Sequence, residues 1–467
     1  MKLIKLAAMA ALTISAPTFA NEIIPVSAET KEISADLRNK AIKDDSAYEI
    51  LKSLTTEVGA RHPGTEGEKA GIEWGIKNLK AFGFDKVYTE DVKMNGWVRE
   101  VEIAEVLLPS YQKMVITALG RSKSTPKGGL EAEIVHFKNY AELEKAKDGS
   151  LSGKIAFISN RMERFKNGAG YGPANIARSK GHELAAKKGA GALLIRSIGT
   201  DAHRNPHTGS TNVAMGYTAI PAVALSNPDA DQLVRLMEYG HTPKIRLNVQ
   251  TKDLGPIVTK NVIGEITGRE LPNEIVVIGG HLDSWDLGTG AVDDGAGVAI
   301  AMATGAFIKN NIKTAPRRTI RVILWGAEEL GLIGARAYAK ARQEDGTIAN
   351  HVIGSESDFG AGPVYGLQSS DNISPSALHV VDTMAAIMGE LGVSRRGGNT
   401  SGGPDMIPLA ALGVPALNLM QDGSDYFDLH HTPDDTFDKV NPEHMRQNLA
   451  VWTVFTFIAA EWPGSFK

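Results

Sequence analysis

The chain has 467 residues, of which 42% are hydrophobic and 22% are charged, and its formal net charge is −4. This length allows two or three folded domains, and the composition is that of a globular protein rather than a disordered or fibrous one. The weak net charge argues against nucleic acid as a partner, and the absence of cysteine excludes disulfides, thiolate metal sites and cysteine nucleophiles.

The first 20 residues have the layout of a secretory signal peptide. Two lysines precede a short apolar run, and the segment ends on small residues, so we expect cleavage after Ala20. The apolar run is short for a membrane span, and an N-terminal anchor is the alternative. We therefore expect an exported protein, periplasmic or secreted, with no membrane attachment after cleavage.

Residues 41–95 are predicted to form two helices followed by a strand, because Ile72, Ile76 and Leu79 recur at helical spacing and residues 86–94 have a strand pattern. Residues 97–255 have a different character and are predicted to form a separate, inserted module. Its expected strands are residues 131–137, 154–160, 191–197 and 219–226, and its expected helices are residues 176–190 and 228–240. Residues 199–212 form a long polar segment, and long loops of this kind are often functional.

Strands and helices alternate from about residue 256 onward. Residues 261–268 and 274–280 are predicted as paired strands, and further strands are expected at residues 318–325, 351–357 and 414–420. Helices are expected at residues 298–309, 331–343, 377–391 and 442–462. This alternation predicts an α/β fold with a mostly parallel or mixed central sheet covered by helices on both faces. We expect residues 21–96 and 256–467 to form this main domain.

Histidine and carboxylate side chains follow these strands where each one ends. They are His281 and Asp283, then Glu328 and Glu329, then Asp358, then His430 and His431, with Asp293 on a loop that enters a helix. The carboxyl ends of parallel strands share one edge of a sheet, which is where such sheets bind ligands, so these side chains are expected to converge.

Imidazole and carboxylate groups without thiolates suit zinc in a catalytic site. Two divalent cations would neutralise the crowded acids, and a shared carboxylate is the natural bridge between two metals. Calcium is the weaker alternative, because DSWDLG has acids at its first and fourth positions rather than at the first, third and fifth. The sequence therefore predicts a site for a pair of metal cations.

Four motifs in this order carry a family resemblance: HLDSWDLGTGAVDDGAG, WGAEELGLIGA, ESDFG and HHTPDDT. Together they resemble the co-catalytic zinc exopeptidases of the aminopeptidase-like superfamily, and GARHPGTEGE near the start fits the same family. Residues 97–255 resemble a protease-associated domain, and this insertion makes the chain most similar to the carboxypeptidase Q-like branch. The resemblance covers nearly the whole chain after the signal peptide.

The resemblance implies two Zn²⁺ ions per chain and a set of residues that hold them. The implied metal ligands are His281, Asp293, Glu329, Asp358 and His431, with Asp293 as the bridge and Asp294 beside it as a structural partner. Glu328 is the implied general base. Asp283 is implied to hold the ring of His281, as partners of metal-bound histidines do.

The sequence does not decide which residues contact the substrate. Many relatives have a tyrosine just before the last histidine ligand, where His430 stands in this chain, so the oxyanion donor is either His430, the nearby Tyr426 or neither. Asp405 either contacts the substrate or caps a turn. His207 is a candidate specificity residue, whereas a metal site formed by His203 and His207 is disfavoured because Pro206 and the loop context break the helical spacing.

The expected activity is hydrolysis of dipeptides and short peptides with free termini, and the resemblance also implies a homodimer. One alternative is a single-zinc acyltransferase of the glutaminyl cyclase kind, which retention of both halves of the ligand set disfavours. The other is a non-catalytic peptide-binding relative, which the retained Glu328 disfavours. Fold alone does not separate these three functions.

Overall fold

The computed structural model describes residues 23–212 and 219–467, so the predicted signal peptide lies outside the described residues. The helices are α1 (Ala28–Ala41), α2 (Ser46–Ser53), α3 (Glu66–Ala81), α4 (Tyr140–Glu144), α5 (Tyr171–Ser179), α6 (Gly181–Lys187), α7 (Asn227–Glu238), α8 (Ala296–Asn311), α9 (Ile333–Glu344), α10 (Leu378–Met388), α11 (Ile407–Ala410), α12 (Tyr426–Leu429) and α13 (Pro442–Glu461). The strands are β1 (Lys86–Leu108), β2 (Gln112–Met114), β3 (Ile116–Ala118), β4 (Leu130–Phe137), β5 (Lys154–Ile158), β6 (Ala192–Arg196), β7 (Ala222–Leu225), β8 (Lys244–Ile266), β9 (Leu271–His281), β10 (Arg318–Trp325), β11 (His351–Glu356), β12 (Val364–Ser369), β13 (Ser394–Arg396) and β14 (Leu417–Gln421).

A mixed sheet of 11 strands runs through the molecule in the order β11-β9-β10-β8-β4-β5-β6-β7-β3, with β1 paired to β8 and β2 paired to β1. Strands β9, β10 and β11 are parallel, whereas β8 is antiparallel to β10, β4 and β1. A second sheet of three strands has the order β13-β12-β14. The mixed α/β architecture confirms the predicted fold class.

Helices cover both faces of the β9–β10 part of the sheet. Val276 and Ile278 of β9 belong to the core formed with α8 and α13, while Ile275 and Val277 belong to a core with α9 and α11. Successive side chains of a strand point to opposite faces, so this alternation gives β9 two buried faces. Residues 275–278 form a continuous apolar run because both faces of β9 are buried.

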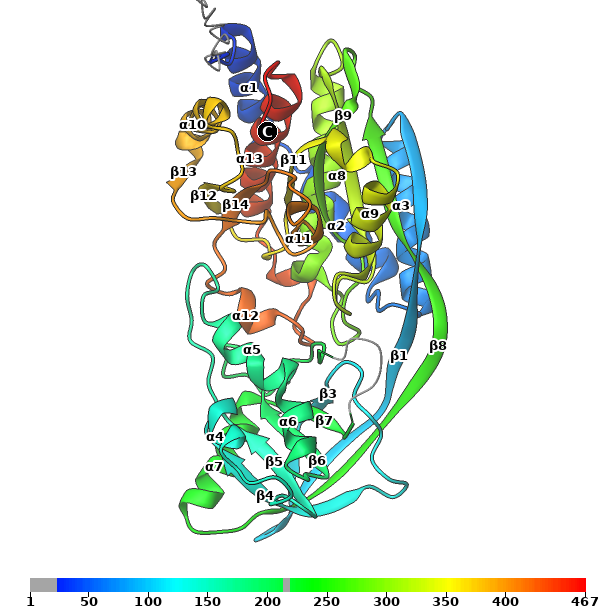
Figure 1. Ribbon diagram of the computed structural model, residues 1–467, viewed down its shortest axis with the longest axis vertical. Helices are drawn as coiled ribbons and strands as arrows, with labels where there is room; N and C mark the ends of the chain where they lie inside the picture. The colour runs from blue at the N-terminus through cyan, green and yellow to red at the C-terminus, as the bar shows by residue number, and fades with distance from the viewer. Residues whose placement is uncertain (1–22, 213–218) are drawn as a thin grey trace, which may run out of the picture.

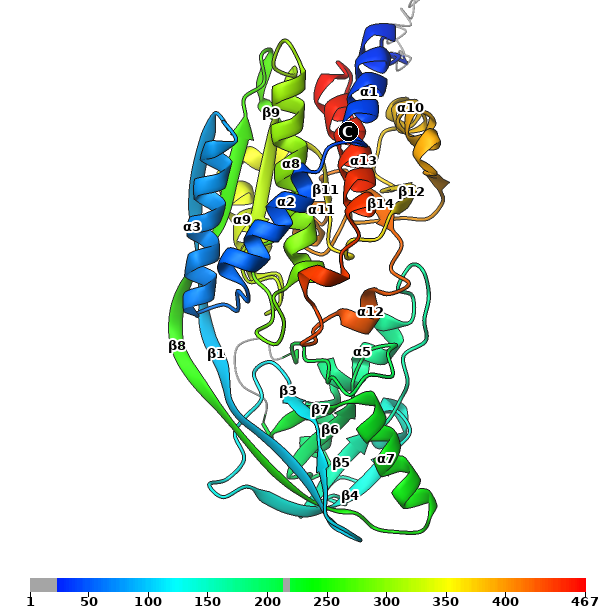
Figure 2. The ribbon, with the colours of Figure 1, turned by 180° about the vertical axis from the view of Figure 1, so that it is seen from behind.

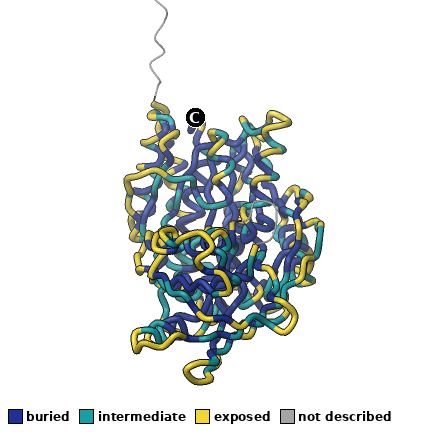
Figure 3. Tube along the Cα trace, turned by 60° about the horizontal axis from the view of Figure 1, so that its bottom comes forward, coloured by how far each residue is buried: buried dark blue, intermediate teal, exposed yellow. Residues whose placement is uncertain are grey.

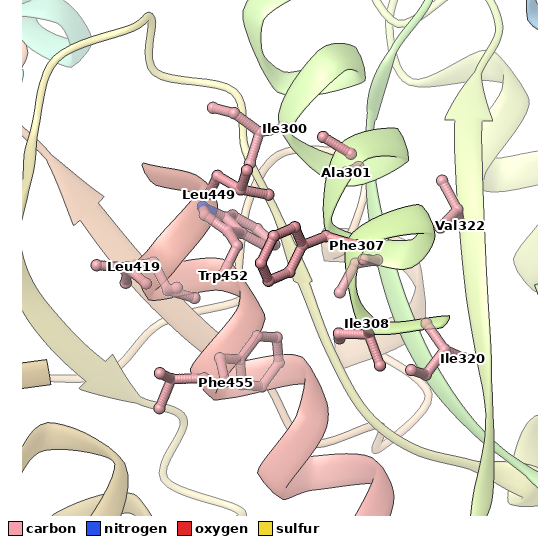
Figure 4. Close-up of a cluster of buried hydrophobic side chains, with 14 of the residues drawn as sticks. Ile300, Ala301, Phe307, Ile308, Ile320, Val322, Leu419, Leu449, Trp452 and Phe455 are labelled. Carbon is pink, nitrogen blue, oxygen red and sulfur yellow. The ribbon is translucent and has the colours of Figure 1, made fainter. Parts of the chain in front are cut away.

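Helix α8 lies in the centre of the larger core. Figure 4 shows its Phe307 and Ile308 between Trp452 of α13 and Ile320 of β10. Residues Ala291–Asn311 are long and apolar enough to cross a membrane, but 94% of the apolar window is buried inside the protein. A helix that is apolar all round is expected in such a central position.

Strands β1 and β8 are both 23 residues long and pair along most of their length. Figure 1 shows them running from the end of the molecule that carries α8 and α13 to the end that carries β4 to β6, and Figure 2 shows the same path from behind. The expected domain limits at residues 96/97 and 255/256 both fall inside these strands. Separate apolar cores lie at the two ends, and Figure 3 shows buried chain inside each of them.

Three local predictions were wrong. Strands β8 and β9 are not paired, because β10 returns parallel to β9 after α8 and pairs with both strands. The single helix expected at residues 176–190 is two helices, α5 and α6, which meet at Lys180. Strand β14 lies in the small sheet, antiparallel to β12, and a bridge between Gly354 and Ala416, the residue before β14, joins it to the large sheet.

Candidate metal centre

The predicted ligands come from segments that end at one edge of the sheet. His281 is the last residue of β9, Glu328 and Glu329 follow β10, and Asp358 follows β11. Asp293 lies in the turn Ala291–Gly295 that leads into α8, and His430 and His431 follow α12. The three parallel strands therefore bring His281, the two glutamates and Asp358 to one place, as the sequence predicted. The turn before α8 adds Asp293, and the loop after α12 adds the two remaining histidines.

Asp293 lies between two histidines. Its Oδ1 is 3.1 Å from Nε2 of His281, and its Oδ2 is 3.1 Å from Nε2 of His431. Asp358 Oδ1 lies 3.7 Å from Nε2 of His281, and Glu329 Oε2 lies 3.0 Å from Nε2 of His431. Each histidine thus shares the Asp293 carboxylate and has one further carboxylate of its own, which is the arrangement of a bridging ligand between two cation positions.

These groups fit divalent cations. Three overlapping sets, His281–Asp294–Asp358, His281–Asp293–Glu329 and Asp293–His430–His431, each place their ligand atoms within 4.8 Å of one another. Glu329 Oε1 and His430 Nδ1 are buried, and neither has a hydrogen-bond partner among the described residues. Buried carboxylates and imidazoles without partners cost free energy, which coordination to a cation offsets.

The pKa values of the buried acids and histidines also indicate that the site favours a bound positive charge. Burial and the charge of Asp358 raise the pKa of Asp294 well above its ordinary value, and burial together with Asp358 and Glu329 does the same to the pKa of Glu328. Burial alone would lower the pKa of His431, but Glu329 and Asp293 raise it to about 9. Carboxylates crowded in a buried site repel one another, so a bound cation would stabilise all of them.

Two aspartates fix the frame of the site. Asp294 accepts the backbone N–H of His281 at 2.9 Å and that of Gly297 at 3.0 Å, as expected of a structural partner. Asp283 differs from its expected role, because its main-chain carbonyl, rather than its carboxylate, lies 2.8 Å from Nδ1 of His281. The Asp283 carboxylate instead accepts the backbone N–H groups of Glu328 at 2.9 Å and Glu329 at 3.2 Å. A carboxylate in this position sets the direction of both glutamates.

The four candidate substrate residues lie in different places. His430 and Tyr426 line a cavity of about 310 Å³ together with Glu328, Glu329 and Asp358. His430 also stacks on His431 at a ring-centroid distance of 3.5 Å. Because its ring nitrogen lies within 4.8 Å of ligand atoms of Asp293 and His431, it is a further candidate ligand.

The other two candidates are buried beside the site. His207 does not line the cavity, and its Nδ1 lies 2.6 Å from the main-chain oxygen of His430. Asp405 is fully buried, and its backbone N–H donates to Glu356 at 2.6 Å. The His207 ring therefore supports the segment that carries His430, whereas both carboxylate oxygens of Asp405 are buried without a hydrogen-bond partner among the described residues. His203 is exposed and contacts Asp434, so the structure does not bring His203 and His207 together as a metal pair.

Helix α5 of the inserted segment supplies cavity residues that the sequence analysis missed. Tyr171, Asn175 and Arg178 line the cavity together with the metal-centre carboxylates. Their spacing of four and three residues places them on one face of a helix, which is the signal that could have identified them. Figure 1 shows α5 beside α12, between the two ends of the molecule.

The chain is similar to known peptidases over most of its length. Residues 261–456 match the model of peptidase family M28. Carboxypeptidase Q from Bos taurus is 32% identical over 417 residues, which cover 89% of this chain and 85% of that protein, and carboxypeptidase Q from Homo sapiens is 32% identical over 415 residues, with 89% and 85% covered.

Solved structures give the same result. The crystal structure of a peptidase M28 precursor from Shewanella amazonensis has a TM-score of 0.91 and 45% identity, and covers 94% of this chain and 98% of that chain. A zinc aminopeptidase from Bacillus subtilis shares the fold, with a TM-score of 0.66, 20% identity, and coverage of 89% and 95%. The resemblance to the zinc exopeptidases is thereby confirmed, and the chain is a peptidase that belongs to family M28.

Proposed function

We propose that this peptidase is an exported exopeptidase that holds two Zn²⁺ ions and hydrolyses dipeptides and short peptides with free termini. The position of the Asp293 carboxylate, 3.1 Å from both His281 and His431, carries the proposal. Asp358 would complete the first metal position and Glu329 the second. Several relatives are named carboxypeptidase Q, one is named a probable leucine aminopeptidase, and a structural neighbour is named a zinc aminopeptidase. These names support both the metal and the exopeptidase class.

The chemistry divides between the metals and the chain. Two bound zinc ions would supply Lewis acidity and a water molecule with a pKa near 7. Glu328 would act as the general base, accepting a proton from the attacking water and returning it to the leaving amine. Its side chain is 16% exposed and 3.9 Å from Nε2 of His281, so it borders both the cavity and the ligand set. The hydrogen bond from its backbone N–H to Asp283 holds it there.

His281 is held in one orientation by its own strand end. Its Nδ1 donates to the Asp283 carbonyl, which leaves Nε2 directed at Asp293 and Asp358. Such partners fix the tautomer of a metal-binding histidine. The same argument applies to His431, whose Nδ1 lies 3.2 Å from the Thr208 carbonyl of the inserted segment.

Export through the N-terminal segment and assembly into a homodimer are further parts of this proposal. The acyltransferase alternative needs only one metal position, whereas both halves of the ligand set meet here at Asp293. A non-catalytic peptide-binding protein would have no use for Glu328 as a general base.

The test measures metal content and dipeptide hydrolysis side by side. The mature protein, Glu328→Gln and the control Glu344→Gln, an exposed residue at the end of α9, are purified and their zinc content is determined by mass spectrometry. We expect about two zinc ions per chain in all three and a loss of kcat of about 10²- to 10⁴-fold in Glu328→Gln alone. Two metals without hydrolysis of any peptide would favour the binding protein, and one metal would favour the acyltransferase.

A further inference from the structure

Arg178 is a buried cation in the wall of the cavity that the metal centre faces. It lies on α5, is 5% exposed, and lines the cavity of about 310 Å³ together with Glu328, Glu329 and Asp358. Its Nη1 donates to the Thr208 carbonyl at 3.0 Å, and its Nη2 donates to the hydroxyl of Tyr171. Within the described part of the chain, its Nε is buried without a hydrogen-bond partner and no carboxylate forms an ion pair with it.

The guanidinium is held firmly in this place. Gly209 packs directly against it, since a Cβ atom on Gly209 would lie 2.2 Å from Nη1 of Arg178. The backbone of Gly209 has a φ of +132°, a conformation that side-chain-bearing residues rarely adopt. The close approach of the Gly209 backbone and the Thr208 carbonyl therefore restricts Arg178 to one orientation.

Two side chains, Tyr171 and His430, lie between Arg178 and the proposed ligand His431. The Tyr171 ring, which receives the Arg178 hydrogen bond, packs edge-on against His430 at a centroid distance of 5.4 Å. His430 in turn stacks on His431 at 3.5 Å. On the same face of α5, Asn175 has a buried Oδ1 without a hydrogen-bond partner among the described residues. Unused polar groups thus line the cavity beside the metal centre.

A buried charge without a partner destabilises the folded protein. A buried, unpaired Arg178 beside a substrate cavity therefore indicates that the cavity binds an anion. Arginine matches a carboxylate in shape, since its planar guanidinium donates two parallel hydrogen bonds to the two oxygens. A peptide with a free C-terminus always carries such a carboxylate. In a dipeptide it follows the scissile carbonyl by one residue, or about 3.5 Å of chain.

We propose that Arg178 binds the free α-carboxylate of the peptide substrate, with Tyr171 and Asn175 beside it, and so selects substrates with an unblocked C-terminus. This inference rests on the proposed function and names the residue that determines its substrate class. The helix that carries Arg178 belongs to the inserted segment, while the metal ligands belong to the remainder of the chain. The position of the inserted segment would then set the distance between the metal centre and the site that binds the C-terminus of the peptide.

The test separates binding of the carboxylate from catalysis. The zinc-loaded mature protein carrying Glu328→Gln is titrated by calorimetry with Ala-Leu and with Ala-Leu amide, which lacks the terminal charge, and the titrations are repeated after adding Arg178→Met. We expect Arg178→Met to weaken Ala-Leu binding by about 30- to 100-fold, as loss of a buried charge-assisted pair does. Binding of Ala-Leu amide should change by less than about threefold.

Two further variants sharpen the result. Arg178→Lys keeps the charge but not the paired donors, and is expected to recover only part of the Ala-Leu affinity. Arg161→Gln removes an exposed arginine of the same segment and is expected to change neither affinity.

Several outcomes would overturn the inference. An equal loss for Ala-Leu and its amide would make Arg178 purely structural, and equal affinities of the two ligands for the parent protein would exclude a carboxylate contact. Absence of Ala-Leu binding would exclude it as well. Failure of the proposed function shows separately, because the enzyme with Glu328 intact would then leave Ala-Leu uncleaved although binding still distinguished the two ligands.

Discussion

Nδ1 of His207 lies 2.6 Å from the main-chain oxygen of His430, and this hydrogen bond joins the inserted segment to the loop that carries His430 and the proposed metal ligand His431. The other ring nitrogen of His207 lies 2.7 Å from Oδ1 of Asp201, so the ring is held on both sides. Thr208 adds a second tie, because its backbone N–H donates to the His431 carbonyl at 3.0 Å. The position of His431 thus depends on a segment more than 200 residues away in the sequence.

The first prediction concerns this tie. We expect His207→Ala to lower the affinity for zinc by about 10- to 100-fold, the usual effect of removing a residue that orients a metal ligand. The measurement is a competition titration with a chelator of known affinity. His203→Ala is the matched control, since His203 lies on the same loop with a side chain that is 63% exposed. Equal zinc affinity in both variants would show that the hydrogen bond does not support the ligand.

The second prediction concerns the Asp283 carboxylate. Each of its oxygens accepts one backbone N–H, from Glu328 and from Glu329, and an asparagine amide offers only one acceptor. We expect Asp283→Asn to lower kcat for dipeptides by about 10- to 100-fold while zinc content stays unchanged. Loss of zinc together with activity would place Asp283 among the groups that determine metal affinity instead.

The third prediction concerns removal of the metal. The buried acids of the site repel one another without a cation, so chelation is expected to lower Tm and added zinc to restore it. A ligand at about 100 times its Kd stabilises the folded state by about 2.7 kcal/mol per site. Calorimetry with and without zinc measures the change, and calcium, the alternative ion considered from the sequence, is the control. A larger effect of calcium would contradict the zinc assignment.

The fourth prediction concerns pH and lies away from the metal centre. Glu68 is buried at the start of α3, where its Oε2 accepts the Gly64 N–H at 2.7 Å, and burial raises its pKa from 4.5 to about 7. The folded state therefore holds this proton more tightly than the unfolded state does. The stabilisation of the folded state by this bound proton is fully present below about pH 4.5 and is lost as the pH rises towards 7.

Glu68→Gln keeps the acceptor for Gly64 without the charge. We expect the variant to be more stable than the wild type at pH 8, by up to about 3 kcal/mol, and equally stable at pH 4. Thermal unfolding across this pH range measures the difference. Glu66→Gln, an exposed neighbour in the same first turn, should not reproduce this pH dependence. An equal gain for Glu68→Gln at both pH values would refute the burial explanation.

Local pattern was sufficient for much of the fold and for placing the candidate ligands at one edge of the sheet. The apolar run before His281 and the run before Glu328 each predicted a buried strand, and acids placed directly after such strands could be assigned to one sheet edge. These inferences use periodicity and chain order, which are properties of the sequence itself. The mixed α/β fold and the meeting of His281, Asp293, Glu329, Asp358 and His431 follow from them.

The tertiary structure decided what depends on long-range pairing and on side-chain direction. Strand β10 lies between β8 and β9 because hydrogen bonding between distant strands, rather than a short connection, sets the order of the sheet. The carbonyl of Asp283 holds His281 while its carboxylate holds the glutamates, a division that residue type cannot reveal. Arg178 faces the cavity because β1 and β8 carry the inserted segment back against the loop after α12. Sequence alone therefore determined which acids and histidines meet at the edge of the sheet, whereas packing between distant segments decided how they are oriented and which further groups surround them.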